Sequence, residues 1–123
     1  MQNMSTAIDE LHQKAMELAD EAFYAKKRQD SQNAQAKYLA AFEYEKAAAM
    51  LLVNEYEQEP SRSVLFRSAA CLLLNLPYPS EDNFRQAEKM VAHGLSGNPP
   101  EAIAEELRSA WQELMDKLQK EAA

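Results

Sequence analysis

The sequence predicts an all-α fold of five helices, and three observations support this class. Apolar residues make up 46% of the 123 residues, which is enough to form one hydrophobic core. The sequence has only two glycines and no alternating runs of β-branched residues, which a sheet and its turns would need. Apolar residues instead recur every three or four positions, as they do along one face of a helix. We therefore expect a single all-helical domain that spans residues 1–123.

The first two helices are expected over residues 6–29 and 31–58, joined by a short polar junction into an antiparallel hairpin. Thr6 can cap the first helix, and Asp30 or Ser31 can cap the second. The first helix has one apolar face: Ile8, Leu11, Ala15, Leu18, Ala22 and Ala25. The second has another: Ala34, Tyr38, Ala41, Phe42, Ala48, Leu52 and Tyr56.

Three further helices are expected over residues 61–76, 81–93 and 99–121. The third is apolar almost all round, which is typical of a helix buried on several sides. Ser80 can cap the fourth, and His93 followed by Gly94 resembles a helix end. Asn98-Pro99-Pro100-Glu101 predicts the start of the fifth helix. Its inner stripe contains the only tryptophan, Trp111, which we expect to anchor this helix: Ile103, Leu107, Trp111, Leu114 and Leu118.

One spacing occurs twice, with small residues on either side of a larger one at i, i+4 and i+7. Small residues at these positions let a neighbouring helix approach closely, so the spacing predicts a helix-pair packing that is repeated once. The two sets are Ala34, Tyr38 and Ala41, and Ala87, Val91 and Gly94.

These positions resemble the second helix of a tetratricopeptide repeat, and Leu18, Ala22 and Ala25 resemble the matching positions of its first helix. Pro99 stands where such a repeat closes. The resemblance implies a right-handed TPR-like array of two antiparallel helical hairpins plus a C-terminal helix. It also implies a non-catalytic module that binds a protein or peptide. Long hairpins of the microtubule-interacting-and-trafficking (MIT) type have a similar pattern, and that alternative stays open.

The charge balance bears on the class of partner and on the compartment. The net charge of −7 disfavours nucleic acid and anionic membranes, and a basic partner face is easier to accommodate. Residues 1–7 lack a signal-peptide pattern, and the longest apolar run, Ala69–Leu74, is too short to span a bilayer. Cys71 is the only cysteine, and we expect it to be a small buried side chain in a reducing, cytoplasmic protein.

No catalytic motif is found, so we expect no enzyme activity, no cofactor and no metal site. His12 and His93 stand in no metal-binding spacing; His12 is expected to face solvent, and His93 to complement a helix end. The glutamates within residues 43–59 are expected to form a solvated acidic face: Glu43, Glu45, Glu55, Glu57 and Glu59.

A candidate partner-binding surface is formed by Phe23, Tyr24, Lys26, Lys27 and Arg28. Phe23 and Tyr24 are neighbours in sequence, so they cannot share one helical face, and at least one is expected to face solvent, a later helix or a partner. The cations form the only basic cluster of the sequence, and could hold a carboxylate or phosphate of a partner or simply complement the helix dipole. Two other functions remain open: an antitoxin-like acidic regulator that neutralises a basic partner, and a structural subunit that associates with itself, as a homodimer for example.

Overall fold

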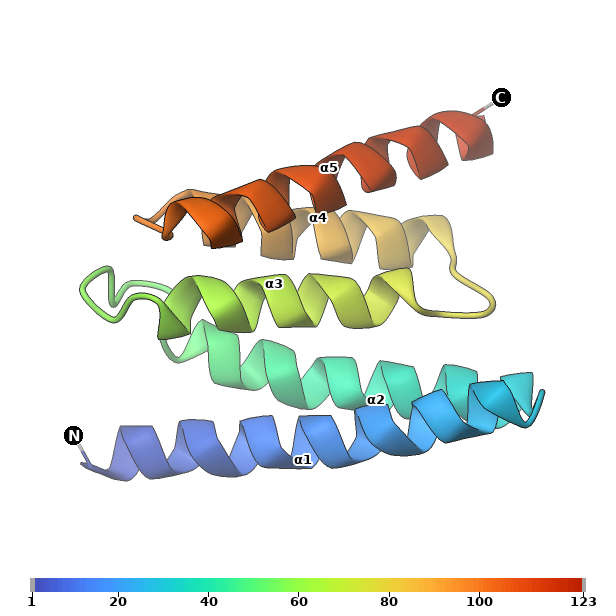
Figure 1. Cartoon of the computed structure of the whole chain (residues 1–123), viewed down its shortest axis with the longest axis horizontal. Coiled ribbons are helices and arrows are strands. Elements are labelled where there is room, and N and C mark those ends of the chain that lie inside the picture. Colours follow the sequence, from blue (N-terminus) through green and yellow to red (C-terminus); the bar gives the residue numbers. More distant parts are fainter. Residues whose placement is uncertain (1, 123) are drawn as a thin grey trace.

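The structure is a computed structural model that describes residues 2–122 of the protein, with side chains described for residues 5–120. It contains five α-helices, and no strand occurs within residues 2–122. The helices pack in sequence order, each antiparallel to the one before, and α3 contacts α2, α4 and α5 (Figure 1). This confirms the all-α class with five helices. Their bounds are α1 Gln2–Lys27, α2 Ser31–Met50, α3 Ser61–Leu74, α4 Glu81–Leu95 and α5 Glu101–Ala122.

The first helix is longer than expected at its N-terminal end. It begins at Gln2, so Thr6 lies inside the helix and does not cap it. The residues before Thr6 include no glycine or proline that would stop a helix there. The expected cap of α2 is confirmed, because the side chain of Asp30 accepts a hydrogen bond from the backbone N–H of Asn33 at 3.4 Å.

The second helix is shorter than expected, ending at Met50 rather than at residue 58. Beyond it, the N–H groups of Val53 and Glu55 bond three residues back, at 3.3 and 2.9 Å, which gives tight turns in place of a helix. The carbonyl oxygen of Val53 instead accepts two hydrogen bonds from Arg62, at 3.2 and 2.9 Å. Tyr56, expected to point inward, is therefore half-exposed.

The fourth helix continues through Gly94 to Leu95, so the expected helix end at His93–Gly94 is wrong. A Cβ atom added to Gly94 would lie 3.0 Å from the side chain of Leu107, so this glycine allows α5 to approach α4. The Ser80 cap of α4 is confirmed as a capping box. The fifth helix begins at Glu101 rather than at residue 99, and the Ala104 N–H donates to the Pro100 carbonyl oxygen at 2.9 Å where the helix starts.

One core runs through all five helices and buries the expected apolar stripes, including both sets of the repeated spacing. The central position of α3 explains why this helix is apolar almost all round. Trp111 is only half-buried, although it packs against the core, so it anchors α5 less completely than expected. The fully buried anchors of α5 are Leu107 and Leu114.

The connections α2–α3 and α4–α5 are joined by a buried polar group, the Arg62–Glu59 cluster. The side chain of Arg62 is fully buried, lies over the rings of Tyr56 and Phe66, and donates to Ser96 Oγ at 3.4 Å. The carboxylate of Glu59 accepts backbone N–H groups from Ser63 at 3.0 Å and from Asn98 at 3.2 Å. Two loops that are far apart in sequence are thereby held together.

The repeated small residues give the first prediction. Ala34 and Ala41 are fully buried in α2, which packs on both α1 and α3. Changing either to leucine should destabilise the protein by about 1–3 kcal/mol, because extra methylene groups must enter a filled space. Thermal or urea unfolding measures this. Ala36→Leu, at an exposed position of the same helix, is the control. Unchanged stability of Ala34→Leu and Ala41→Leu would contradict a close helix crossing.

Gly97 gives the second prediction. A Cβ atom there would lie 2.5 Å from Nη1 of Arg62 and 3.0 Å from Oε2 of Glu59. The guanidinium is held by the Val53 carbonyl oxygen and cannot move aside freely, so Gly97→Ala should lower the free energy of unfolding by about 1–3 kcal/mol. Asn98→Ala, which keeps the backbone N–H that Glu59 uses, should have little effect. Equal stability of the two variants would show that Arg62 is not packed as described.

Candidate functional site

The two aromatic residues predicted near the end of α1 are both exposed. Phe23 is 49% exposed and Tyr24 is 60% exposed, while Ala22 and Ala25 of the same helix are fully buried. Neither ring enters the core, as expected of at least one of them, but the two rings lie close enough on the surface to contact each other, which the expectation of separate helical faces had not included. We call Phe23, Tyr24, Lys26, Lys27 and Arg28 the hairpin-end surface, since α1 ends there and turns into α2.

The rings and cations of the hairpin-end surface contact one another. Phe23 and Tyr24 meet edge to face, with ring centroids 5.6 Å apart, and Nζ of Lys27 lies 5.2 Å from the Phe23 centroid. Lys26 has a structural contact, because its Nζ donates to the carbonyl oxygen of Asn75 at 2.9 Å. Lys27 and Arg28 are exposed, and neither forms an ion pair with a described residue. These two cations therefore remain available to a ligand.

Sequence reasoning missed a third exposed aromatic residue at this end of the molecule, Tyr78. Its ring is 60% exposed, in the connection between α3 and α4. Gln35 of α2 fixes this connection: it donates to the Tyr78 carbonyl oxygen at 3.1 Å and accepts the Tyr78 N–H at 3.0 Å. The α1–α2 turn and the α3–α4 connection lie at the same end of the bundle (Figure 1). The flanking residues Pro77 and Pro79 are the signal that this tyrosine lies outside a helix.

His12 and Glu45 form a pair that was not expected. Nδ1 of His12 lies 2.8 and 3.0 Å from the two carboxylate oxygens of Glu45, while the His12 side chain stays 43% exposed and so still faces solvent in part. Glu45 is fully buried, so it does not belong to a solvated acidic face. Its place four residues after Ala41 and three after Phe42 puts it on the inner stripe, a signal that was available in the sequence. The pair joins α1 to α2.

Two other predicted polar residues take part in packing. His93 lies in the last turn of α4, as expected, and its ring also packs on Phe66 with centroids 5.2 Å apart. Glu59 was expected to lie on a solvated face, but it is largely buried within the Arg62–Glu59 cluster. Glu43 and Glu57 are exposed as expected.

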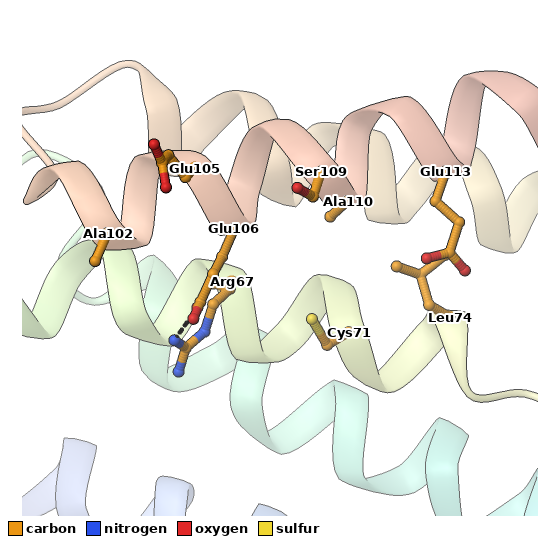
Figure 2. A pocket seen from close by; sticks show the side chains of 9 residues that line it. All are labelled: Arg67, Cys71, Leu74, Ala102, Glu105, Glu106, Ser109, Ala110 and Glu113. Atoms are coloured by element: carbon orange, nitrogen blue, oxygen red, sulfur yellow. Dashed lines mark hydrogen bonds and ion pairs between the residues drawn. The ribbon is translucent and has the colours of Figure 1, made fainter.

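Cys71 is half-buried rather than fully buried, and it lines a groove of about 750 Å³ between α3 and α5 (Figure 2). Arg67 and Leu74 line the same groove from α3, and Arg67 pairs with Glu106 of α5 across it. Burial raises the pKa of the Cys71 thiol above its ordinary value. Arg67 acts in the opposite direction, while the charges of Glu106 and Glu113 raise the pKa further.

The thiol gives the third prediction. The raised pKa lowers the fraction of Cys71 that is ionised, and partial burial limits the access of a reagent to it. Iodoacetamide should therefore alkylate Cys71 in the native protein at least about tenfold more slowly than Cys71 in the protein unfolded in urea. The rate for the native protein should rise with pH toward a midpoint above that of the unfolded protein. Mass spectrometry of quenched samples measures both rates. Equal rates at neutral pH would contradict this placement of Cys71.

The described residues form neither a metal-binding cluster nor a membrane span. No three of the described His, Cys, Asp and Glu side chains gather closely enough to hold a metal ion. Among the described helices, none combines the length and the hydropathy that crossing a membrane requires. Comparisons of the sequence with protein-family models and curated proteins, and of the structure with solved structures, found no match.

Proposed function

We propose that the protein is a non-catalytic protein-binding module that holds an acidic segment of a partner protein on its hairpin-end surface. One observation carries the proposal: Phe23 and Tyr24, adjacent in sequence, are 49% and 60% exposed beside Lys27 and Arg28. Large aromatic rings left in water beside cations are typical of interface anchors rather than of a solvated helix face.

The overall charge of the protein favours an acidic partner segment at this place. Lys27 and Arg28 form a local positive site on a protein of net charge −7. Such a site attracts a carboxylate, from an acidic side chain or from a C-terminal residue. The negative charge of the rest of the surface disfavours binding of the same acidic segment at any other place. The contact between Lys27 and the ring of Phe23 holds one cation in place before a ligand arrives.

The finer architectural proposal is a right-handed TPR-like array. It is supported by the order of packing, in which each helix lies antiparallel to the one before. It is also supported by the burial of the small residues at both occurrences of the repeated spacing, including Gly94 against Leu107. A single free cysteine, Cys71, is in keeping with a reducing compartment for such a module.

The fourth prediction tests the function. The double variant Lys27→Glu/Arg28→Glu should weaken partner binding at least tenfold, or about 1.4 kcal/mol, because it reverses both available charges. Stability should change little, since both side chains are exposed. The measurement is capture of partners from lysate of the cells that make the protein, followed by titration of the captured partner at increasing salt, which should weaken binding.

A matched control separates the site from the general charge. Lys14→Glu/Lys120→Glu changes two exposed lysines on α1 and α5 and brings the net charge from −7 to −11, as the test variant does. The control variant should bind the partner as the wild type does. Equal weakening in both variants, or in neither, would contradict the hairpin-end surface. Capture of one strongly basic partner by all variants would favour the acidic regulator, and capture of further copies of the protein alone would favour a self-associating subunit.

A further inference from the structure

Large apolar side chains are exposed at a second place of the described chain, away from the hairpin-end surface. This place is the C-terminal half of α2 with the turns that follow it, where the exposed residues are Tyr44, Met50, Leu51 and Tyr56. Single exposed apolar side chains are ordinary on a protein surface, whereas several within one short stretch are typical of an interaction surface. We therefore looked for a hollow that these side chains border.

Met50 forms part of one wall of a groove between α2 and α4. Both helices pack on α3 but hardly on each other, so a hollow of about 470 Å³ remains between their side chains (Figure 1). The α2 wall consists of Lys46 and Met50, which are one helical turn apart. We call this hollow the α2–α4 groove. Its α4 wall is one helical stripe about three turns long: Asp82, Gln86, Lys89, Met90 and His93.

The apolar part of the α2–α4 groove consists of two methionines. Met90 is buried and forms the floor, while Met50 is 38% exposed in the opposite wall. Unbranched thioether side chains adjust to apolar groups of different shape, so they suit a surface that receives a side chain of another protein. The groove can therefore hold an apolar anchor between its two walls.

The two walls of the α2–α4 groove also carry cations that have no anionic partner. Neither Lys46 nor Lys89 forms an ion pair with any residue whose side chain the structure describes. Their acidic neighbours in the sequence are engaged elsewhere, because Glu45 is buried against α1 and Glu88 pairs with Arg85 at 3.2 Å. Two like charges that line one hollow favour an anionic group between them.

Asp82 is the only acid among the described residues that line the groove, and it does not neutralise the lysines. Its carboxylate accepts a hydrogen bond from Gln86 at 2.7 Å and lies in the first turn of α4, where the helix dipole favours an acid. Asp82 stands seven residues before Lys89, which is about 10 Å along the helix at about 1.5 Å per residue. The part of the groove between Lys46 and Lys89 is therefore positive, a local exception on a protein of net charge −7.

We propose that the α2–α4 groove binds an acidic amphipathic helix of a partner protein. An apolar side chain of that helix inserts between Met50 and Met90, and carboxylates on its two flanks pair with Lys46 and Lys89. The partner helix lies along the three-turn stripe of α4. The inference goes beyond the function proposed above, because it adds a second surface that does not depend on the hairpin-end surface.

A helix fits this groove better than an extended segment does. The two walls belong to helices that run in the same direction, since α2 and α4 are each antiparallel to α3 (Figure 1). In a helix with leucines at i, i+4 and i+7, the residues at i+1 and i+3 lie on opposite flanks of the apolar stripe. Carboxylates at these positions reach both walls at once. A strand presents only one row of side chains to each side, so it would place its acids and its anchor in line.

The fifth prediction uses a synthetic peptide with this pattern, acetyl-Ala-Leu-Glu-Gln-Glu-Leu-Ala-Ala-Leu-Glu-Gln-Glu-Ala-amide. Titrated into the ¹⁵N-labelled protein, it should shift the amide signals of residues 46–50 and 82–93 more than those of residues 23–28. Acetyl-Ala-Leu-Glu-Gln-Glu-Ala-Leu-Leu-Ala-Glu-Gln-Glu-Ala-amide has the same composition with its leucines on different faces. It should bind at least about tenfold more weakly, because charge alone does not fill the hollow. Binding of the first peptide should also weaken as salt is added.

Variants separate the groove from the general charge. Lys46→Glu/Lys89→Glu should weaken binding of the first peptide at least about tenfold. The matched control Lys14→Glu/Lys120→Glu also brings the net charge from −7 to −11 and should bind the peptide as the wild type does. Circular dichroism checks that each variant is folded. Because Lys46 is half-buried, the single variant Lys89→Glu, at an exposed position, is measured too and should weaken binding at least about threefold.

Several outcomes would overturn the proposal. They include equal weakening by the two double variants, equal binding of the two peptides, and no signal shift up to about 1 mM peptide. A wild-type protein that dimerises in sedimentation experiments, and loses the dimer in Lys46→Glu/Lys89→Glu without binding the peptide, would show that a second copy occupies the groove. Shifts confined to residues 23–28, and lost in Lys27→Glu/Arg28→Glu, would place the acidic helix on the hairpin-end surface instead. Peptide binding that persists in Lys27→Glu/Arg28→Glu is the expected result, so failure of the two proposals can be distinguished.

Discussion

The connections at one end of the bundle are arranged around one buried cation, the guanidinium of Arg62. Burying an arginine side chain costs several kcal/mol unless its N–H groups find hydrogen-bond acceptors and its charge is balanced by nearby groups. Here two of its nitrogens donate to the Val53 carbonyl oxygen, two aromatic rings cover its faces, and the carboxylate of Glu59 lies 4.0 Å from Nη1. Nη1 itself has no hydrogen-bond partner among the described residues, so its compensation comes from Glu59 through space.

This compensation sets the path of two connections. Because the Val53 carbonyl oxygen is directed to Arg62, the end of α2 becomes a series of tight turns. Because Glu59 accepts the Asn98 N–H, the connection to α5 is held against the start of α3. The close approach of Gly97 to Arg62 leaves no room for a side chain. One end of the bundle is thereby fixed by polar contacts, while the other end carries the hairpin-end surface.

Much of the fold could be predicted from the sequence because periodicity is a local property. The helix count, the central place of α3 and the caps Asp30 and Ser80 all follow from residues a few positions apart. The end of α2 could not be predicted, because its cause is a contact with a residue nine positions further on. Gly94 resembled a helix end, but its absent side chain serves contact with α5.

The features of the candidate sites also differ in whether they depend on residues that are close together in the sequence. Exposure of an aromatic ring near the end of α1 followed from the adjacency of Phe23 and Tyr24 alone. The buried Glu45 was also detectable on its stripe, whereas its partner His12 comes from another helix. The groove between α3 and α5 could not be predicted at all, because Cys71 and Ser109 form its walls only after two helices that are not sequence neighbours pack together.

The sequential packing of the helices has a consequence for the order in which these surfaces can form. Contacts between consecutive helices require only short loop closures, so a hairpin can assemble as soon as its second helix has left the ribosome. The α1–α2 hairpin then presents the exposed rings of Phe23 and Tyr24 before the rest of the protein exists. The wall that α5 supplies to the groove between α3 and α5 is made after the other four helices. A nascent polypeptide would thus expose the rings and cations of the hairpin-end surface for some time before α5 packs on α3 and α4.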